Sequence, residues 1–368
     1  MRTCALFLFL ACAAAQELGP EQLFKEAMAA QQRGDDTAAI RDYRQLLKQQ
    51  PDMFQARANL GVLLARQGHF DEAIEQYRLA LDGHESDSRF GFKLRFNLAI
   101  AYYKKSAFEE AAREFDTLHR ANLADTRVST LLGDCYAHLG QDEQALAILG
   151  PIEAANPDDL AVASLLAPVL IRTGHQSEGM ARYDKVGRLG HSAEAYLLAG
   201  QTALKLSLFE DARDYADAAI KLDPHFPGVY TLRGMALPLL GDSEGAIEAL
   251  NKALAADPND FDAHFTLGKT LRTAGDLPGA RRHLARAMQL KPDSAVAFYE
   301  MARVERSENK IEDAVKDFEK AIHLDPTWAQ PHVELSALYF RLNRPADGER
   351  EKAEFDRLNV LPGGKLQN

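Results

Sequence analysis

Three pairs of residues, each separated by 34 positions, could bind a ligand. They are Lys269 and Arg303, Arg272 and Arg306, and Phe265 and Tyr299. Ammonium and guanidinium groups bind carboxylates through charge-assisted hydrogen bonds, and aromatic rings add flat apolar surface. In a chain of net charge -11, a cluster of cations would attract anionic ligands. The alternative is that the arginines pair with Glu300, Glu334 and neighbouring carboxylates and only keep this face soluble.

The residues that usually carry catalysis fall in no recognisable arrangement. The sequence has no His-Glu-x-x-His, no Cys-x-x-Cys, no glycine-rich phosphate loop and no Gly-x-Ser-x-Gly. The eleven histidines are scattered, and acidic pairs such as Glu109-Glu110 are typical of solvated helix faces. We therefore expect no enzymatic activity, no cofactor and no metal site. An enzyme with an unrecognised site is the alternative.

The composition argues against two classes of protein, those that bind nucleic acid non-specifically and those that span a membrane. The chain has 46% hydrophobic and 26% charged residues, which is typical of a globular protein. Its negative charge opposes non-specific binding to nucleic acid. No internal or C-terminal stretch reaches the roughly 18 apolar residues that a membrane span needs. We expect a partner that is a protein or peptide, and no membrane span.

The N-terminus has the three parts of a signal peptide. Arg2 supplies a positive charge, an apolar run extends from Cys4 to Ala15, and Ala13-Ala14-Ala15 forms a small-x-small cleavage motif. We expect residues 1–15 to be a signal peptide and the protein to be periplasmic or secreted. Lipidation of Cys12 is one alternative, and an unprocessed N-terminus of a cytosolic protein is another. After cleavage only Cys135 remains, so no intrachain disulfide can form.

Several residue types recur with a period of 34, which indicates a repeat architecture. Each proline follows an apolar segment, and a small residue lies at a fixed distance before it. The prolines are Pro224, Pro258, Pro292 and Pro326, and the alanines are Ala212, Ala246, Ala280 and Ala314.

These residues resemble the tetratricopeptide repeat, a unit of two helices joined by a turn. Repeat two shows the motif most fully, with Asn59-Leu60-Gly61, Leu64, Gly68, Phe70, Ala73, Tyr77 and Ala80. The resemblance implies an all-α fold, a right-handed superhelical solenoid of about ten repeats. We place the repeats at about residues 20, 54, 92, 126, 160, 193, 227, 261, 295 and 329.

The motif has a physical explanation at each position. Small residues at positions 8, 20 and 27 let the two helices of a repeat approach each other. Glycine at position 15, as in Gly34 and Gly68, ends the first helix in a left-handed conformation. Pro168 should kink the first helix of repeat five, whereas Pro238 lies nearer a helix end and should matter less.

The repeats predict four segments. Residues 1–15 are the signal peptide, residues 16–188 hold repeats one to five, and residues 189–360 hold repeats six to ten, ending in a polar capping helix. Residues 361–368 are expected to be a disordered tail. Repeat five is degenerate, with Gly179 where alanine is usual, and should form a soft joint between the two halves.

The resemblance also implies where a ligand would bind. In tetratricopeptide arrays, positions 2, 5, 6, 9, 12 and 13 of the first helix line a concave groove, and we call these the groove positions. They include the main predicted site, which is Phe265, Lys269, Arg272, Tyr299, Arg303 and Arg306, and a secondary site, which is Asn59, Lys93, Asn97 and Tyr103.

Two known groove styles match only in part. Asn59 and Asn97 match the asparagine ladder in the repeats of O-linked N-acetylglucosamine transferase, but Leu131 then interrupts it. This resemblance concerns the scaffold and implies no sugar transfer. A co-chaperone groove that holds a terminal carboxylate is not expected, because Phe24 and Met28 stand where that style has Lys and Asn.

The expected function is a non-catalytic scaffold or adaptor that presents its groove to extended partners, acidic ones among them. It resembles an exported bacterial envelope repeat protein and should be monomeric or weakly associating. The alternative is a structural subunit of an envelope complex that assembles through its end repeats.

The signal peptide gives the first testable prediction. Protein purified from its native host should begin at Gln16, because cleavage is expected after Ala15. N-terminal sequencing and intact mass would measure this. A chain that begins at Met1 would contradict export by this route.

Overall fold

The computed structural model describes residues 18–82 and 89–360, so the predicted signal peptide and tail lie outside it. Within these residues the chain forms twenty α-helices and one short 3-10 helix, with no strands. The predicted all-α repeat fold is confirmed. None of the described helices combines the length and apolar character needed to cross a bilayer.

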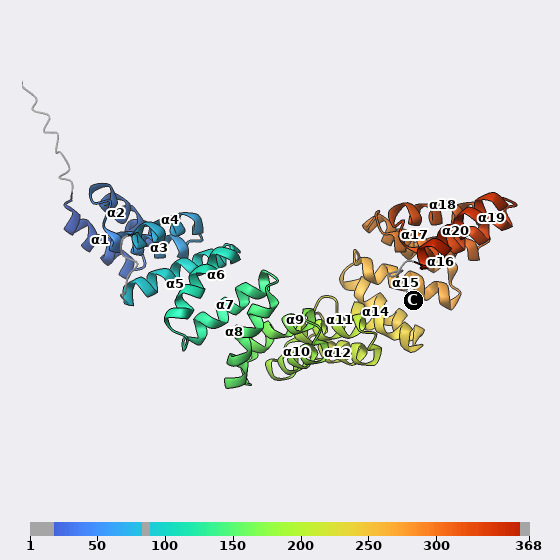
Figure 1. Cartoon of the computed structure of the whole chain (residues 1–368), viewed down its shortest axis with the longest axis horizontal. Helices are drawn as coiled ribbons and strands as arrows, with labels where there is room; N and C mark the ends of the chain where they lie inside the picture. Colours follow the sequence, from blue (N-terminus) through green and yellow to red (C-terminus); the bar gives the residue numbers. More distant parts are fainter. Residues whose placement is uncertain (1–17, 83–88, 361–368) are drawn as a thin grey trace, which may run out of the picture. The chain divides into compact units, whose positions relative to one another are not determined.

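The helices, which are labelled in Figure 1, fall into two compact units, residues 1–173 and 174–368. The first unit contains α1 Pro20–Gln32, α2 Asp36–Gln49, α3 Phe54–Arg66, α4 Phe70–Leu81, α5 Arg89–Lys104, α6 Phe108–Ala121, α7 Thr126–His138, α8 Asp142–Ala155 and α9 Leu160–Arg172. This boundary lies between the two helices of repeat five, before the division at residue 188 that the sequence suggests.

The second unit begins with the second helix of repeat five and continues through repeats six to ten. It contains α10 Gln176–Gly190, α11 Ala193–Lys205, α12 Phe209–Leu222, α13 Val229–Ala236, the 3-10 helix η1 Leu237–Leu240, α14 Ser243–Ala256, α15 Phe261–Ala274, α16 Leu277–Leu290, α17 Ala295–Ser307, α18 Ile311–Leu324, α19 Ala329–Arg341 and α20 Pro345–Val360.

Small residues allow the two helices of each repeat to pack closely. A Cβ atom added to Gly61 would lie 2.6 Å from the Tyr77 ring, and one added to Gly268 would lie 2.6 Å from Leu284 Cγ. These pairs join position 8 of the first helix to position 24 of the second. In these two repeats even one extra carbon at position 8 would overlap its neighbour, which explains the glycine there, whereas repeat one has room for alanine at Ala27.

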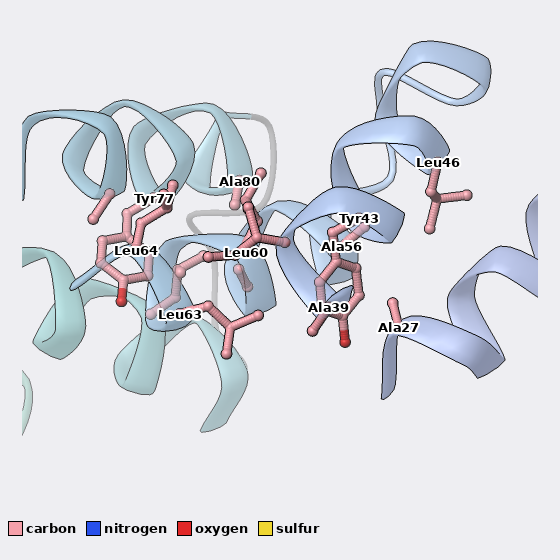
Figure 2. Packing of buried hydrophobic residues seen from close by; sticks show 14 of the residues in the cluster. Ala27, Ala39, Tyr43, Leu46, Ala56, Leu60, Leu63, Leu64, Tyr77 and Ala80 are labelled. Atoms are coloured by element: carbon pink, nitrogen blue, oxygen red, sulfur yellow. The ribbon is translucent and has the colours of Figure 1, made fainter. Parts of the chain in front are cut away.

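The core of the first repeats follows the same rule. Ala27, Ala39 and Ala56 are completely buried and lie beside larger side chains such as Tyr43 and Leu46 (Figure 2). Small and large buried residues of α1, α2 and α3 pack together in one cluster, which matches the close packing of protein interiors. Each helix pair therefore depends on its neighbours for burial of its apolar face.

Position 15 is left-handed in all ten repeats, including those without glycine there. Gly34 has φ 78° and Gly68 has φ 81°, as predicted. The same conformation occurs at Ser106, Ser207, Asn309 and Asn343, where φ lies between 56° and 60°. The turn between the two helices imposes this conformation, and four repeats tolerate its cost for a residue with a side chain.

The two prolines differ in how far they interrupt the helices that contain them. The helix α9 runs without interruption across Pro168, whereas the α-helical part of repeat seven ends at Ala236 and continues as η1. Proline has no N–H to donate to the carbonyl of Gly234, and its ring crowds that carbonyl. The prediction that Pro238 would matter less was therefore wrong.

Ion pairs at recurring positions connect neighbouring repeats in the first unit. Arg66 Nη1 lies 3.0 Å from Asp36 Oδ1, and Arg172 Nη2 lies 2.6 Å from Asp142 Oδ1. Each pair joins position 13 of one repeat to position 17 of the repeat before it. Such pairs help to fix the register of stacking more than they add stability.

Substitutions at position 15 of two repeats should change the free energy of unfolding in opposite directions. Gly68→Ala should lower the free energy of unfolding by about 1–2 kcal/mol, because only the backbone conformation opposes the new Cβ. Ser106→Gly should raise it by about 0.5 kcal/mol by removing that strain. Urea unfolding followed by circular dichroism would measure both. Equal effects of the two changes would show that the turn conformation is not the cause.

Candidate functional site

The second unit has a hollow of about 400 Å³ on the groove side of repeats seven to nine. Its walls come from the end of α13, from η1, from the first residue of α14, from α15 and from the start of α17. It is lined by Met235, Pro238, Leu239, Ser243, Phe261, Asp262, Phe265, Thr266, Lys269, Thr270, Thr273 and Val296. Nine of these twelve residues occupy groove positions, so the predicted groove coincides with a real depression at this point.

One wall of the hollow is aromatic. The rings of Phe261 and Phe265 are nearly parallel, with centroids 5.9 Å apart and planes at 5°. Lys291 Nζ lies 4.0 Å from the centroid of Phe261, which is a cation–π contact. Leu239 of η1, which also lines the hollow, is 52% exposed. The hollow therefore offers apolar surface that water covers in the free protein.

Lys269 is the cation that lines the hollow. Its side chain is exposed, and among the described residues no ion pair or hydrogen bond engages its ammonium group. Phe265, one turn before it on α15, lies in the same hollow. Two of the six residues of the main predicted site are thus brought together where a ligand could reach them.

The three arginines of the predicted site are paired instead with glutamates. Glu300 is 5% exposed and accepts from Arg272 Nε at 3.0 Å and from Arg303 Nη1 at 3.1 Å. Arg306 pairs with Glu334 of the next repeat. Because Arg272 lies on α15 and Glu300 on α17, the pair connects successive repeats. The pairing with Glu300 and Glu334 is the one that the alternative interpretation described. Because two of these pairs connect successive repeats, the arginines also contribute to the packing of the solenoid.

Tyr299 lies in the core and not on the groove surface. It is 7% exposed, and its ring centroid lies 4.6 Å from that of Trp328 and 5.6 Å from that of Phe318. Burial raises the pKa of its hydroxyl. The expectation that Tyr299 provides flat apolar surface for a ligand was wrong, because α18 covers it.

Two of the four residues of the secondary site, Asn59 and Tyr103, form hydrogen bonds within the protein. Asn59 Nδ2 donates to Tyr43 Oη at 3.0 Å, and the hydroxyl of Tyr103 donates to Asp134. Burial, with the carboxylate of Asp134 as a further cause, raises the pKa of Tyr103. Lys93 is exposed and Asn97 is half-buried, and neither has a partner among the described residues. Only these two side chains are open to a ligand.

Family comparisons identify the repeats. Models described as tetratricopeptide repeat match residues 24–88, 102–167, 197–261, 239–303 and 295–327. The chain belongs to the tetratricopeptide repeat family. Tetratricopeptide arrays are scaffolds for protein interaction, and the helix pairs described above have that architecture.

Individual relatives of this tetratricopeptide protein are distant. DnaJ homolog subfamily C member 3 of Gallus gallus is 22% identical over 231 residues, and the match spans 54% of this chain and 44% of that protein. The chain therefore matches less than half the length of this relative.

Similar solved structures include two tetratricopeptide proteins. YrrB, titled a TPR protein with an unusual peptide-binding site, is 24% identical with a TM-score of 0.40 over 48% of this chain and 92% of its own. MamA from Desulfovibrio magneticus RS-1 is 23% identical with a TM-score of 0.42 over 45% of this chain and 94% of its own.

The main predicted site did not include the apolar residues of repeat seven that line the hollow. Met235, Pro238 and Leu239 occupy groove positions 9, 12 and 13 of repeat seven, and all three are apolar. That run of apolar residues was the signal that could have revealed the hollow. The main site was predicted in repeats eight to ten because of their lysine and arginines, but the structure pairs these arginines with glutamates.

The described side chains show no arrangement typical of metal binding or of a reactive thiol. Among residues 18–82 and 89–360, no three His, Cys, Asp or Glu side chains are grouped so as to hold a metal ion. Cys135 is buried, and this burial raises the pKa of its thiol to about 12. At neutral pH the thiol is protonated and inaccessible, which makes it a poor nucleophile.

Two substitutions on α15 should separate packing from ligand binding. Arg272→Gln should lower the free energy of unfolding by about 1–3 kcal/mol, because it leaves the buried carboxylate of Glu300 with one fewer partner. Lys269→Gln, one turn earlier, should change it by less than about 0.5 kcal/mol. Chemical unfolding would compare them. Equal losses in the two variants would contradict the assignment of Arg272 to the packing of the repeats.

Proposed function

We propose that the protein is an exported, non-catalytic scaffold that binds extended, acidic segments of partner proteins. The proposed site is the hollow of repeats seven to nine together with the groove surface beside it. The observation that carries this proposal is that residues at the family's groove positions form this hollow, with the unpaired ammonium of Lys269 at it.

The local charge supports an acidic ligand. Lys269, Arg272 and Arg303 provide three positive charges on the groove side of α15 and α17, against one buried carboxylate, that of Glu300. Asp262 also lines the hollow and reduces the excess to one positive charge. The chain as a whole carries a net charge of -11. A positive region on such a background attracts carboxylates and excludes cationic segments.

We propose further that the protein acts as a monomer or a weak oligomer outside the cytoplasm. The N-terminal sequence motivates export, and the apolar hollow leaves surface for a partner. A structural subunit that assembles through its end repeats would form concentration-dependent oligomers. Light scattering of the mature chain over a range of concentrations separates these two roles.

Capture of partners with charge variants tests the site. Mature protein, residues 16–368, would be used to capture proteins from a native envelope extract, with identification by mass spectrometry. Lys269→Glu should lose partners that the unaltered protein retains, since reversing one contact to a carboxylate costs about 1.5–3 kcal/mol, or roughly ten- to 150-fold in affinity.

Lys320→Glu provides the matched control. Lys320 is an exposed lysine on the second helix of repeat nine, away from the groove positions, and its reversal changes the net charge equally. It should retain the same partners as the unaltered protein. An identical partner list for Lys269→Glu, with unchanged helicity, would reject the groove of repeats seven to nine as the binding site.

A further inference from the structure

We infer that the hollow of repeats seven to nine receives one bulky apolar side chain of the ligand, and that a carboxylate next to it in the ligand pairs with Lys269. The inference rests on the proposed peptide-binding function and specifies the kind of segment that would be bound. It would be an extended stretch with an aromatic or large aliphatic residue beside an acidic one.

The hollow exists because the first helix of repeat seven ends early. In repeat eight, α15 continues to Ala274, which is position 14, whereas α13 stops at Ala236, which is position 10. The remaining residues form the tighter turn η1, in which Pro238 donates no hydrogen bond. This change of backbone leaves Leu239 half exposed beside the aromatic wall of α15.

The lining of the hollow fits an apolar side chain better than a polar one. Six of its residues are apolar, and these are Met235, Pro238, Leu239, Phe261, Phe265 and Val296. Of the threonines that also line it, Thr270 and Thr273 already donate their hydroxyl hydrogens to backbone carbonyls of α15, those of Thr266 and Lys269. A ligand hydroxyl or amide that entered would find few free partners. An aromatic ring could stack on the wall, and aliphatic carbons could displace the water there.

Lys269 determines what lies beside the anchored side chain. Lys269 lines the same hollow, and its ammonium group has no internal partner among the described residues. The arginines further along the groove are engaged by Glu300 and Glu334 and are less available. A carboxylate adjacent to the apolar residue would therefore meet one free ammonium group. Charge complementarity is what assigns an acidic peptide, rather than a purely apolar surface, to this site.

Synthetic peptides test the pairing directly. The probe is a fluorescein-labelled decapeptide of glycine and serine with phenylalanine followed by aspartate at its centre. Three companions carry alanine for phenylalanine, asparagine for aspartate, or both changes. Fluorescence anisotropy with the mature chain should show that the phenylalanine–aspartate peptide binds at least tenfold more tightly than either single replacement.

Variants of the chain should identify the residues that bind the phenylalanine and the aspartate of the peptide. Leu239→Ser should weaken binding of the phenylalanine peptide at least threefold and leave the alanine peptide unchanged. Thr273→Trp places a large group at the exposed edge of the hollow and should have the same effect. Lys269→Glu should remove the preference for aspartate over asparagine. Leu189→Ser is the control, because Leu189 is 48% exposed and lies outside the hollow.

The outcomes separate this inference from the proposed function. If acidic peptides bind through Lys269 equally well with phenylalanine or alanine, the apolar anchor is wrong and the proposed function stands. If no peptide binds while Lys269-dependent partners are captured, the inference is again rejected alone. If neither experiment shows dependence on Lys269, both are rejected. A dimer of the unaltered chain that Leu239→Ser abolishes would assign the hollow to a second copy and overturn the inference.

Discussion

The close contact between the two helices of a repeat is the constraint on which the other features depend. At position 8, Gly61, Gly133 and Gly268 each face a large side chain of the second helix at a separation that leaves no room for a Cβ atom. This contact fixes the angle and distance of the helix pair. It also decides which side of the first helix is buried, and therefore which positions remain available to form the groove.

The same packing gives charged residues two different roles. Position 12 of one repeat lies near position 6 of the next, so Arg272 meets Glu300 and Arg306 meets Glu334. Among residues 18–82 and 89–360, no carboxylate pairs with Lys269 at position 9. Ion pairs between repeats specify how the helix pairs stack, whereas an unpaired lysine beside apolar surface retains the capacity to bind. Positive charges on the same face of the solenoid therefore differ in function: the paired arginines hold repeats together, whereas Lys269 can bind a ligand.

Much of this could be predicted from the sequence, because the determinants are local. Glycine at position 15 and the spacing of small residues predicted the turns and helix pairs, including the left-handed conformation at Gly68. The burial of Tyr299 could not be predicted, because it depends on contacts with Phe318 of α18 and with Trp328, the residue before α19. Pro238 was misjudged for a related reason. Whether a proline near a helix end matters depends on which backbone carbonyl it crowds, and the repeat frame alone did not settle that.

The hollow is built from three consecutive repeats, from Met235 to Val296, and from no other part of the described chain. Each repeat buries its surface mainly against its immediate neighbours. A unit of 34 residues could therefore be duplicated or lost elsewhere in the second unit without rebuilding this site. Descendants of one gene can therefore differ in the number of repeats and still keep the same binding surface.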